Sequence, residues 1–181
     1  QVLSKREDLT GMKVVLDCAN GAGYKVGPEV FFELGAEVVT ISTEPNGKNI
    51  NYKCGAMFPN QMAEKTKLQL ADLGIALDGD ADRVVFSDEE GQIIHGDHII
   101  AVLAKEMKLS KQLLQNQVIG TTMSNLGLEI FLDSININLH RTNIGDRYIL
   151  DEMIKSKTNL GGEPSGHILL TDYAKTGDGL L

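Results

Sequence analysis

Apolar and polar positions alternate in blocks along the first part of the chain. A short apolar run from Met12 to Asp17 stops at a glycine turn, and a helical stretch with Pro28 in its first turn follows. Gly35 closes that helix, because glycine readily takes the conformation that ends helices. The blocks therefore predict strands and helices in turn, as in a parallel α/β sheet. The next predicted elements are a strand over 37–41, a loop over 43–55, a helix carrying Met62, Thr66, Leu70 and Leu73, and a strand over 74–78.

The alternation is interrupted after residue 78 and then restarts. Apolar residues at 84–86 and 93–94 flank the polar turn 88–91, which predicts a hairpin. A helix from Asp97 would place one apolar face toward a core, and a polar linker over 108–116 follows it. That face comprises Ile99, Ile100, Val102, Leu103 and Met107, and the second alternation predicts strands over 118–121, 137–141 and 167–170 with helices over 125–133 and 146–155.

This repeated pattern indicates an α/β fold of two tandem small α/β domains with mixed, mainly parallel sheets. We place the first domain at 1–95 and the second at 96–181, with the second truncated at its C-terminal end. The chain begins at Gln1 without a methionine and ends at Leu181 directly after a glycine-rich turn. We therefore expect both ends to continue in a longer protein.

The net negative charge of the chain argues against nucleic acids and anionic membranes as partners. The formal net charge is -8, whereas nucleic acids or anionic membranes would call for a basic face. No apolar stretch reaches the ~20 residues that span a bilayer, and no charged-then-apolar leader opens the chain. Cys18 and Cys54 are too few for a disulfide framework. We expect a soluble cytoplasmic protein that binds neither nucleic acid nor membrane.

Carboxylates are concentrated between residues 78 and 97, where seven of them accompany one strong base, Arg83. Asp78, Asp80 and Asp82 alternate in a turn at the carboxyl end of a predicted buried strand, where open α/β sheets place ligand sites. Carboxylates this close repel one another unless a cation neutralises them, and oxygen ligands suit magnesium, manganese or calcium rather than zinc. Magnesium fits best with phosphate chemistry, in which Arg83 would hold another oxygen of the same phosphate.

Three other interpretations of this turn stay open. In a calcium loop the aspartates would fill the first, third and fifth positions and Glu89 the twelfth, but Arg83 stands at the sixth, where glycine is required. A haloacid-dehalogenase nucleophile would need threonine in place of Asp82. A purely structural turn would use its carboxylates to cap backbone amides.

The glycine-rich segment 161–167 is a second candidate site, because it holds Glu163, Ser165 and His167. Its glycines allow a ligand to approach the backbone, and its side chains offer acceptor, donor and switchable groups that suit a polyhydroxylated ligand. A plain glycine-rich turn is the alternative. Serine hydrolysis is disfavoured, because there is no G-x-S-x-G elbow and Pro164 precedes the serine.

Two weaker patterns occur elsewhere. Asn20-Gly21-Ala22-Gly23 resembles a dinucleotide-binding turn, but its glycines miss the G-x-G-x-x-G spacing by one residue, so packing of a helix on its strand is favoured. His95 and His98 near Asp97 offer metal ligands, yet their loose spacing favours polar packing.

The two candidate loops in this order resemble the alpha-D-phosphohexomutases. The matching segments are Asp-Gly-Asp-Ala-Asp-Arg at 78–83 and Gly-Glu-Pro-Ser-Gly-His at 162–167, and the resemblance covers essentially the whole chain. Segments 17–24, 123–127 and 145–148 are similar to the phosphoglucosamine mutase branch of the family. Phosphomannomutase relatives usually carry Gly-His in place of Gly145-Asp146, which favours an amino-sugar substrate.

The resemblance implies the second and most of the third of four domains, so domains I and IV of the same polypeptide would be the chain's partners. It implies an isomerase that interconverts glucosamine 6-phosphate and glucosamine 1-phosphate through a phosphoserine and a bisphosphorylated sugar. The serine loop is absent from this chain, which is therefore expected to fold but not to catalyse. Mannose or glucose phosphates are the alternative substrates, a non-catalytic cation-binding module is disfavoured, and a homodimer stays open.

The resemblance also assigns roles to single residues. It implies that magnesium is held by Asp78, Asp80 and Asp82, that Arg83 lies beside the phosphoserine, and that the sugar is met by Glu163, Ser165, His167 and Asp146. Two positions depart from the family pattern. Ala81 replaces the more usual glycine, which is tolerated if its φ is negative, and Pro164 replaces the glutamine typical of the branch.

Overall fold

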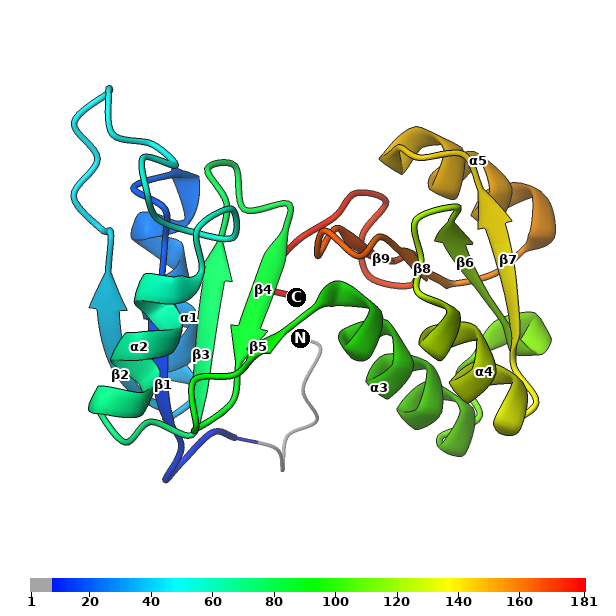
Figure 1. The fold of residues 1–181 in the computed structure, drawn as a ribbon, viewed down its shortest axis with the longest axis horizontal. Coiled ribbons are helices and arrows are strands. Elements are labelled where there is room, and N and C mark those ends of the chain that lie inside the picture. The colour runs from blue at the N-terminus through cyan, green and yellow to red at the C-terminus, as the bar shows by residue number, and fades with distance from the viewer. Residues whose placement is uncertain (1–7) are drawn as a thin grey trace. The chain divides into compact units, whose positions relative to one another are not determined.

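The computed structural model describes residues 8–181, which fold into two compact units (Figure 1). The first unit comprises residues up to Ile94 together with Gly179–Leu181, and the second comprises His95–Asp178. The first seven residues of the predicted domain 1–95 lie outside the described residues. Within residues 8–181, no helix is both long and apolar enough to cross a lipid bilayer.

The first unit is a five-stranded mixed sheet in the order β2-β1-β3-β4-β5. The strands β2, β1 and β3 are parallel, whereas β4 and β5 continue the sheet as antiparallel strands. Its elements are β1 (Lys13–Asp17), the 3-10 helix η1 (Ala22–Tyr24), α1 (Val26–Glu33), β2 (Glu37–Ile41), α2 (Asn60–Leu68), β3 (Leu73–Leu77), β4 (Val84–Ser87) and β5 (Ile93–Ile94).

Alternation along β1 divides the core of the first unit between the two faces of its sheet. Val14 and Leu16 pack with Phe31 of α1 on one face, whereas Val15 packs with Met62 of α2 on the other. The parallel strands are apolar on both faces because a helix covers each face. The helix α1 ends at Glu33 with Leu34 as its C-cap, and Gly35 follows with a φ of +91° and an amide that donates to the Phe32 carbonyl at 3.0 Å.

The second unit is a four-stranded sheet in the order β7-β6-β8-β9. The strands β7, β6 and β8 are parallel and β9 is antiparallel. Ile100 of α3 and Leu132 of α4 belong to one core cluster, and Ile149 and Met153 of α5 belong to another. The elements are α3 (Gly96–Leu109), the 3-10 helix η2 (Leu114–Asn116), β6 (Gln117–Thr121), α4 (Leu126–Ser134), β7 (Asn138–Thr142), α5 (Asp146–Ser156), β8 (Leu160–Gly162) and β9 (Ile168–Leu170).

The predicted α/β class with tandem units and mixed sheets is confirmed, but three details are wrong. The helix predicted to carry Leu70 and Leu73 ends earlier: Leu70 has a φ of +50° and is 88% exposed, and Leu73 begins β3. Val102 lies outside the buried face of α3, because it is 58% exposed. The strand β8 was not predicted, because two of its three residues, Gly161 and Gly162, are glycines with low strand propensity.

Candidate metal and sugar loops

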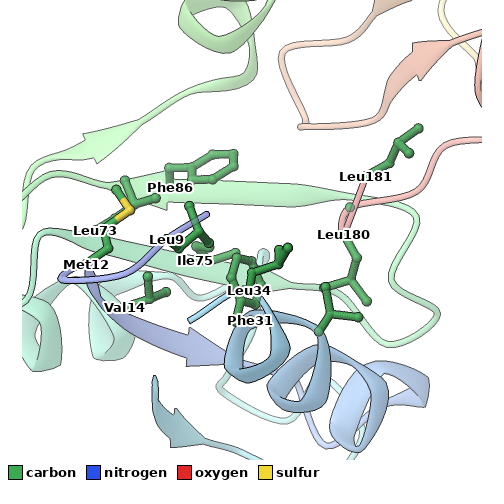
Figure 2. Close-up of a pocket in the computed structure, with 12 residues that line it drawn as sticks. Leu9, Met12, Val14, Phe31, Leu34, Leu73, Ile75, Phe86, Leu180 and Leu181 are labelled. Carbon is green, nitrogen blue, oxygen red and sulfur yellow. The ribbon is translucent and has the colours of Figure 1, made fainter. Parts of the chain in front are cut away.

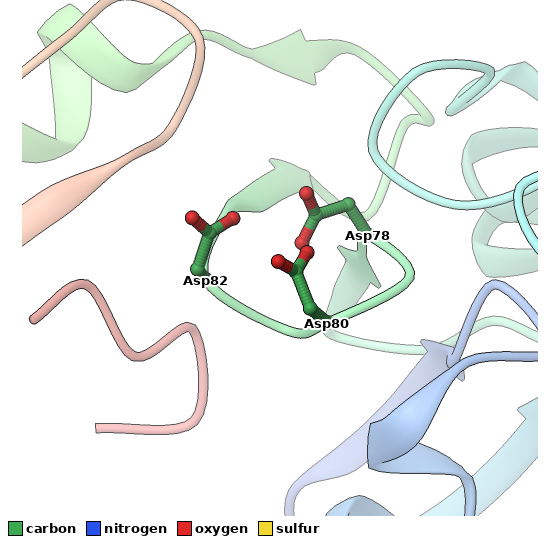
Figure 3. A group of neighbouring side chains, drawn as sticks. All are labelled: Asp78, Asp80 and Asp82. Carbon is green, nitrogen blue, oxygen red and sulfur yellow. The ribbon is translucent and has the colours of Figure 1, made fainter. Parts of the chain in front are cut away.

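The β3–β4 loop, which we call the acidic loop, brings three aspartates together (Figure 3). Ligand oxygens of Asp78, Asp80 and Asp82 all lie within 4.8 Å of one another. Asp78 is 5% exposed, whereas Asp80 is open to solvent. Three carboxylate oxygens that converge at one point, with a side open to solvent, fit a hard divalent cation that keeps other ligands such as water or phosphate.

Arg83 lies against these carboxylates and offsets part of their charge. Its amide donates to Asp78 Oδ1 at 3.1 Å, and its Nε lies 3.6 Å from Asp78 Oδ2 and 3.7 Å from Asp82 Oδ1. Burial nevertheless raises the pKa of Asp78, and the Asp82 and Asp80 carboxylates add to the rise, whereas the bond from the Arg83 amide opposes it. The loop would therefore gain from a cation that stabilises the charged form of Asp78.

Ala81 takes a backbone conformation that the sequence did not predict. The resemblance to the family implied that alanine is tolerated at this position if its φ is negative. The structure has φ at +62°, in the left-handed region. An L side chain is strained there because its Cβ approaches the following carbonyl oxygen, at a cost of about 1–2 kcal/mol.

The glycine turn 20–23 packs directly against the acidic loop. The amide of Ala22 donates to the Gly79 carbonyl at 2.7 Å. A Cβ on Gly21 would lie 2.6 Å from the Gly79 Cα, so no side chain fits there. The glycine therefore serves the contact between two loops, which favours the packing explanation over dinucleotide binding.

Asp17 is an acid of this region that the sequence pattern did not single out. It is fully buried at the end of β1, where its Oδ1 accepts from the Ala19 amide at 2.9 Å and its Oδ2 accepts from the Gly55 amide at 2.8 Å. These bonds anchor the glycine turn and the end of the loop 43–55 at the sheet edge that carries the acidic loop. Its place at the carboxyl end of a central parallel strand is the signal that would have found it.

The β8–β9 loop, which we call the sugar loop, holds Glu163 and Ser165 in direct contact. Glu163 Oε1 accepts from the Gly145 amide at 2.9 Å, and its Oε2 accepts from Ser165 Oγ at 3.1 Å. The Glu163 amide donates to the His167 carbonyl at 2.9 Å, which closes the loop. Glu163 is half-buried and Ser165 is exposed, so a ligand can reach both groups. The preceding glycines, expected in the loop, instead belong to β8.

The other two residues expected to meet the sugar are His167 and Asp146. His167 is 6% exposed at the end of the loop, and its backbone carbonyl helps to close it. Asp146 is exposed at the start of α5, where its Oδ1 accepts from the Arg147 amide at 2.7 Å. The segment Gly145-Asp146 therefore meets the loop through the backbone of Gly145.

Among residues 8–181, His95 and His98 belong to no group of three or more side chains that could share an ion. The rings of His95 and His98 are stacked with centroids 6.4 Å apart. Within the part of the chain that the structure describes, the three loop aspartates form the one group of three or more acidic, histidine or cysteine side chains whose ligand atoms are close enough to share an ion.

A cavity of about 450 Å³ beside α1 in the first unit is unsuited to a phosphosugar (Figure 2). Its walls carry no polar side chain that would bind phosphate or hydroxyl groups, and they include none of the predicted site residues. The lining residues are Leu9, Met12, Val14, Val30, Phe31, Leu34, Leu73, Ile75, Phe86, Gly179, Leu180 and Leu181.

Two family profiles divide the chain between them. Residues 1–91 match the profile described as phosphoglucomutase/phosphomannomutase, alpha/beta/alpha domain II. Residues 95–181 match the profile described as domain III of the same family.

Curated relatives match along the whole chain. A phosphoglucosamine mutase of Rhizobium johnstonii is 52% identical over 181 residues, which are 100% of this chain and 40% of the relative. A phosphoglucosamine mutase of Nitratiruptor sp. is 54% identical over 173 residues, which are 96% of this chain and 39% of the relative. The chain thus spans about 40% of the length of the curated relatives that it matches.

The fold agrees with a solved structure. The crystal structure of a phosphoglucomutase/phosphomannomutase family protein from Burkholderia thailandensis superimposes with a TM-score of 0.84 at 27% identity, over 93% of this chain and 37% of that one. With both profiles, the whole-length relatives and this fold in agreement, the chain belongs to the phosphoglucomutase/phosphomannomutase family and comprises its domains II and III.

Proposed function

We propose that the protein carrying this chain is an isomerase that interconverts glucosamine 6-phosphate and glucosamine 1-phosphate. The observation that carries the proposal is the convergence of Asp78, Asp80 and Asp82 beside Arg83 in the first unit. The same chain presents a Glu163-Ser165 pair in the second unit. Relatives at 52% and 54% identity named phosphoglucosamine mutase support the choice of sugar.

The proposed reaction is a phosphoryl transfer that balances over one cycle. A serine outside this chain would give its phosphoryl group to the free hydroxyl of the sugar phosphate, forming a bisphosphorylated sugar. The other phosphoryl group then returns to the serine and the isomeric monophosphate leaves. Magnesium held by the three aspartates would supply charge neutralisation at the phosphoryl oxygens. Arg83, with its side chain 41% exposed, adds a second positive charge at that loop.

The sugar loop must accept its ligand in two orientations, because either phosphate of the bisphosphate has to reach the serine. The proton of Ser165 is directed to Glu163 in the free chain, so the pair presents a carboxylate and a hydroxyl with lone pairs left to accept from a sugar. Each sugar hydroxyl both donates and accepts, which lets the pair bind either orientation. In this proposal His167 orients the loop and Asp146 contributes to substrate binding.

A phosphomannomutase or phosphoglucomutase activity is the second candidate, because the family profiles cover both activities. The chain by itself is proposed to be inactive, since it has no serine loop. The division into domains at 1–95 and 96–181, the homodimer and the cytoplasmic location stay predictions.

Mutase activity of a full-length protein carrying this chain tests the proposal. Glucosamine 6-phosphate, mannose 6-phosphate and glucose 6-phosphate would be supplied in turn, with magnesium and with the metal removed by a chelator. We expect a magnesium-dependent preference for the amino sugar. A preference for mannose or glucose phosphate would overturn the amino-sugar assignment, and an absence of turnover on all three would overturn the mutase.

A further inference from the structure

The first residue of α3 packs against the sugar loop without room for a side chain. The Gly96 amide donates to the Pro164 carbonyl at 3.2 Å. A Cβ on Gly96 would lie 2.5 Å from the Glu163 carbonyl oxygen and 2.9 Å from the Gly166 nitrogen. These are backbone atoms, so relief would require the loop or the helix to move. Space, rather than an unusual φ, is therefore what requires glycine at this position.

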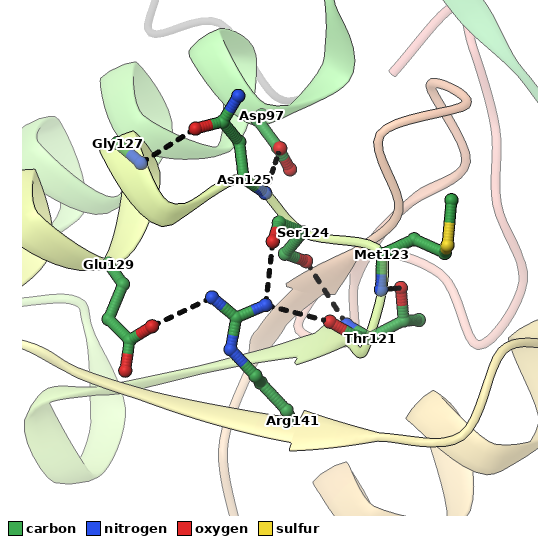
Figure 4. A network of polar contacts seen from close by, with 8 residues as sticks. All are labelled: Asp97, Thr121, Met123, Ser124, Asn125, Gly127, Glu129 and Arg141. Carbon is green, nitrogen blue, oxygen red and sulfur yellow. Dashed lines mark hydrogen bonds and ion pairs between the residues drawn. The ribbon is translucent and has the colours of Figure 1, made fainter.

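The next residue ties the same helix end to a second loop (Figure 4). Asp97 is 8% exposed, and its Oδ2 accepts from the Asn125 amide at 2.7 Å. Asn125 caps α4, because its Oδ1 accepts from the Gly127 amide at 2.7 Å. The start of α3 thus contacts the β8–β9 loop through Gly96 and the β6–α4 turn through Asp97.

The β6–α4 turn is itself held from β7. Arg141 Nη1 donates to the Ser124 carbonyl at 2.6 Å and to the Thr121 carbonyl at 3.2 Å, and its Nη2 donates to Glu129 at 2.8 Å (Figure 4). Ser124 Oγ accepts from the Thr121 amide at 3.1 Å. The turn that Asp97 contacts is therefore held by its own hydrogen bonds and by those from Arg141. Its bond to Asp97 in turn fixes the start of α3.

We propose that Gly96 and Asp97 are positioning residues that hold the Glu163-Ser165 pair in the position required for sugar binding. The proposal rests on the proposed function of this loop. Gly96 sets the distance between the loop backbone and α3. Asp97, through its bond to the Asn125 amide, prevents the start of α3 from moving away from the loop. A binding pair must be held to within about 0.5 Å of its productive geometry by supporting contacts. Neither residue needs to touch the substrate.

Substitutions of Asp97 can distinguish its role as a hydrogen-bond acceptor from the effect of its charge. Its Oδ1 is buried without a hydrogen-bond partner in the described part of the chain. An asparagine would keep an acceptor for the Asn125 amide, while it would lose the charge and place an NH2 group where Oδ1 lies. Asp97→Asn is therefore expected to preserve the anchor, whereas Asp97→Ala removes it.

The first readout is the amide NMR signal of Gly145 in the 181-residue chain, because this amide donates to Glu163. We expect the signal to shift in Gly96→Ala and Asp97→Ala and to stay in place in Asp97→Asn. His98→Ala is the control, since His98 also lies in the first turn of α3 but its side chain is exposed, and the Gly145 signal should stay in place. An unchanged Gly145 signal in Gly96→Ala would refute the proposal.

The second readout is kinetic and uses the full-length protein. We expect Gly96→Ala to raise KM for the sugar phosphate about tenfold or more, in line with the sensitivity of sites to their supporting contacts, while manganese binding to the acidic loop is unchanged. A wild-type KM in Gly96→Ala, or a loss of manganese binding along with turnover, would also refute the positioning role. If the wild-type protein shows no turnover but the Gly145 signal still shifts as expected, the mutase proposal fails and the structural coupling stands.

Discussion

The two units place their candidate site loops at equivalent positions in similar sheets. In each unit a loop joins the third parallel strand to an antiparallel neighbour, from β3 to β4 in the first and from β8 to β9 in the second. The first loop carries three acids around Asp80, and the second carries Glu163 and Ser165. The same scaffold thus presents an acidic loop that we propose binds a cation and a Glu163-Ser165 loop that we propose binds sugar hydroxyls, and the two differ in their loop residues.

Among the described residues, the two units differ in what packs beside the helix that follows their first central strand. In the second unit α3 packs on α4 and β8, which leaves that face of the sheet covered by two helices. In the first unit, the described residues leave an apolar cavity beside α1, over β3, whose lining includes Phe31 and Ile75 (Figure 2).

The largest effect is expected from removing one acid of the first loop. Asp80→Asn should weaken magnesium binding and lower turnover of the full-length protein at least about 100-fold, the size of loss seen when preorganised charge stabilisation is removed. Isothermal titration with magnesium and a mutase assay measure the two effects. Glu89→Gln is the control, because it removes one exposed acid from the neighbouring turn. Near wild-type turnover in Asp80→Asn would contradict a cation-binding role for the acidic loop, and with it the proposed difference between the acidic loop and the sugar loop.

A matched pair of glycines tests whether the two sheets are packed alike. A Cβ on Gly74 of β3 would collide with Met62 of α2, and a Cβ on Gly161 of β8 would lie 2.7 Å from Met153 Sδ of α5. Alanine at either position should lower the free energy of unfolding by about 1–3 kcal/mol, because overpacking displaces core side chains. Urea unfolding measures the change. If only one substitution destabilises the protein, the equivalence of the two packing arrangements is lost.

Replacing the strained alanine should act on the first unit alone. Ala81→Gly is expected to raise the free energy of unfolding by up to about 0.5 kcal/mol, since relief of left-handed strain exceeds the entropy that glycine loses on folding and the loss of a partly buried methyl group. Thermal unfolding without metal detects the gain. Ala63→Gly inside α2 is the contrasting variant and should destabilise, because it adds backbone entropy to the unfolded chain and removes a buried methyl group. A lower stability in Ala81→Gly would contradict the assigned strain.

The smallest effect concerns the pH dependence of the metal-free first unit. Because the folded-state pKa of Asp78 is raised by burial, the folded chain keeps this proton to higher pH than the unfolded chain does. The contribution of Asp78 to stability therefore falls as pH rises from the ordinary value of 3.8 through the raised pKa. Asp78→Asn should remove this trend and should be more stable than the wild type above that window.

Denaturation across pH, with and without magnesium, measures this difference. Saturating magnesium should reverse the order of the two proteins, because the cation stabilises the wild-type carboxylate and cannot bind asparagine as well. An equal pH dependence of the wild type and the variant would contradict the raised pKa.

Local patterns in the sequence were sufficient for most of the fold. Short apolar runs such as Met12 to Asp17 predicted the buried strands, and Gly35 predicted a helix end, because these signals act over a few residues. The pattern failed at Leu70, which is apolar but stands in an exposed turn. It failed again at β8, whose glycines are strand residues only because β6 and β9 pair with them.

The composition of both candidate loops was determined by the sequence alone, since the side chains Asp78, Asp80, Glu163 and Ser165 carry their chemistry wherever they lie. The tertiary structure decided how those side chains are supported. It placed Gly21 against Gly79 and Gly96 against the sugar loop, contacts that join residues far apart in the chain. Such contacts leave no periodic signal in a sequence, because they depend on where the strands of each sheet bring distant backbones together.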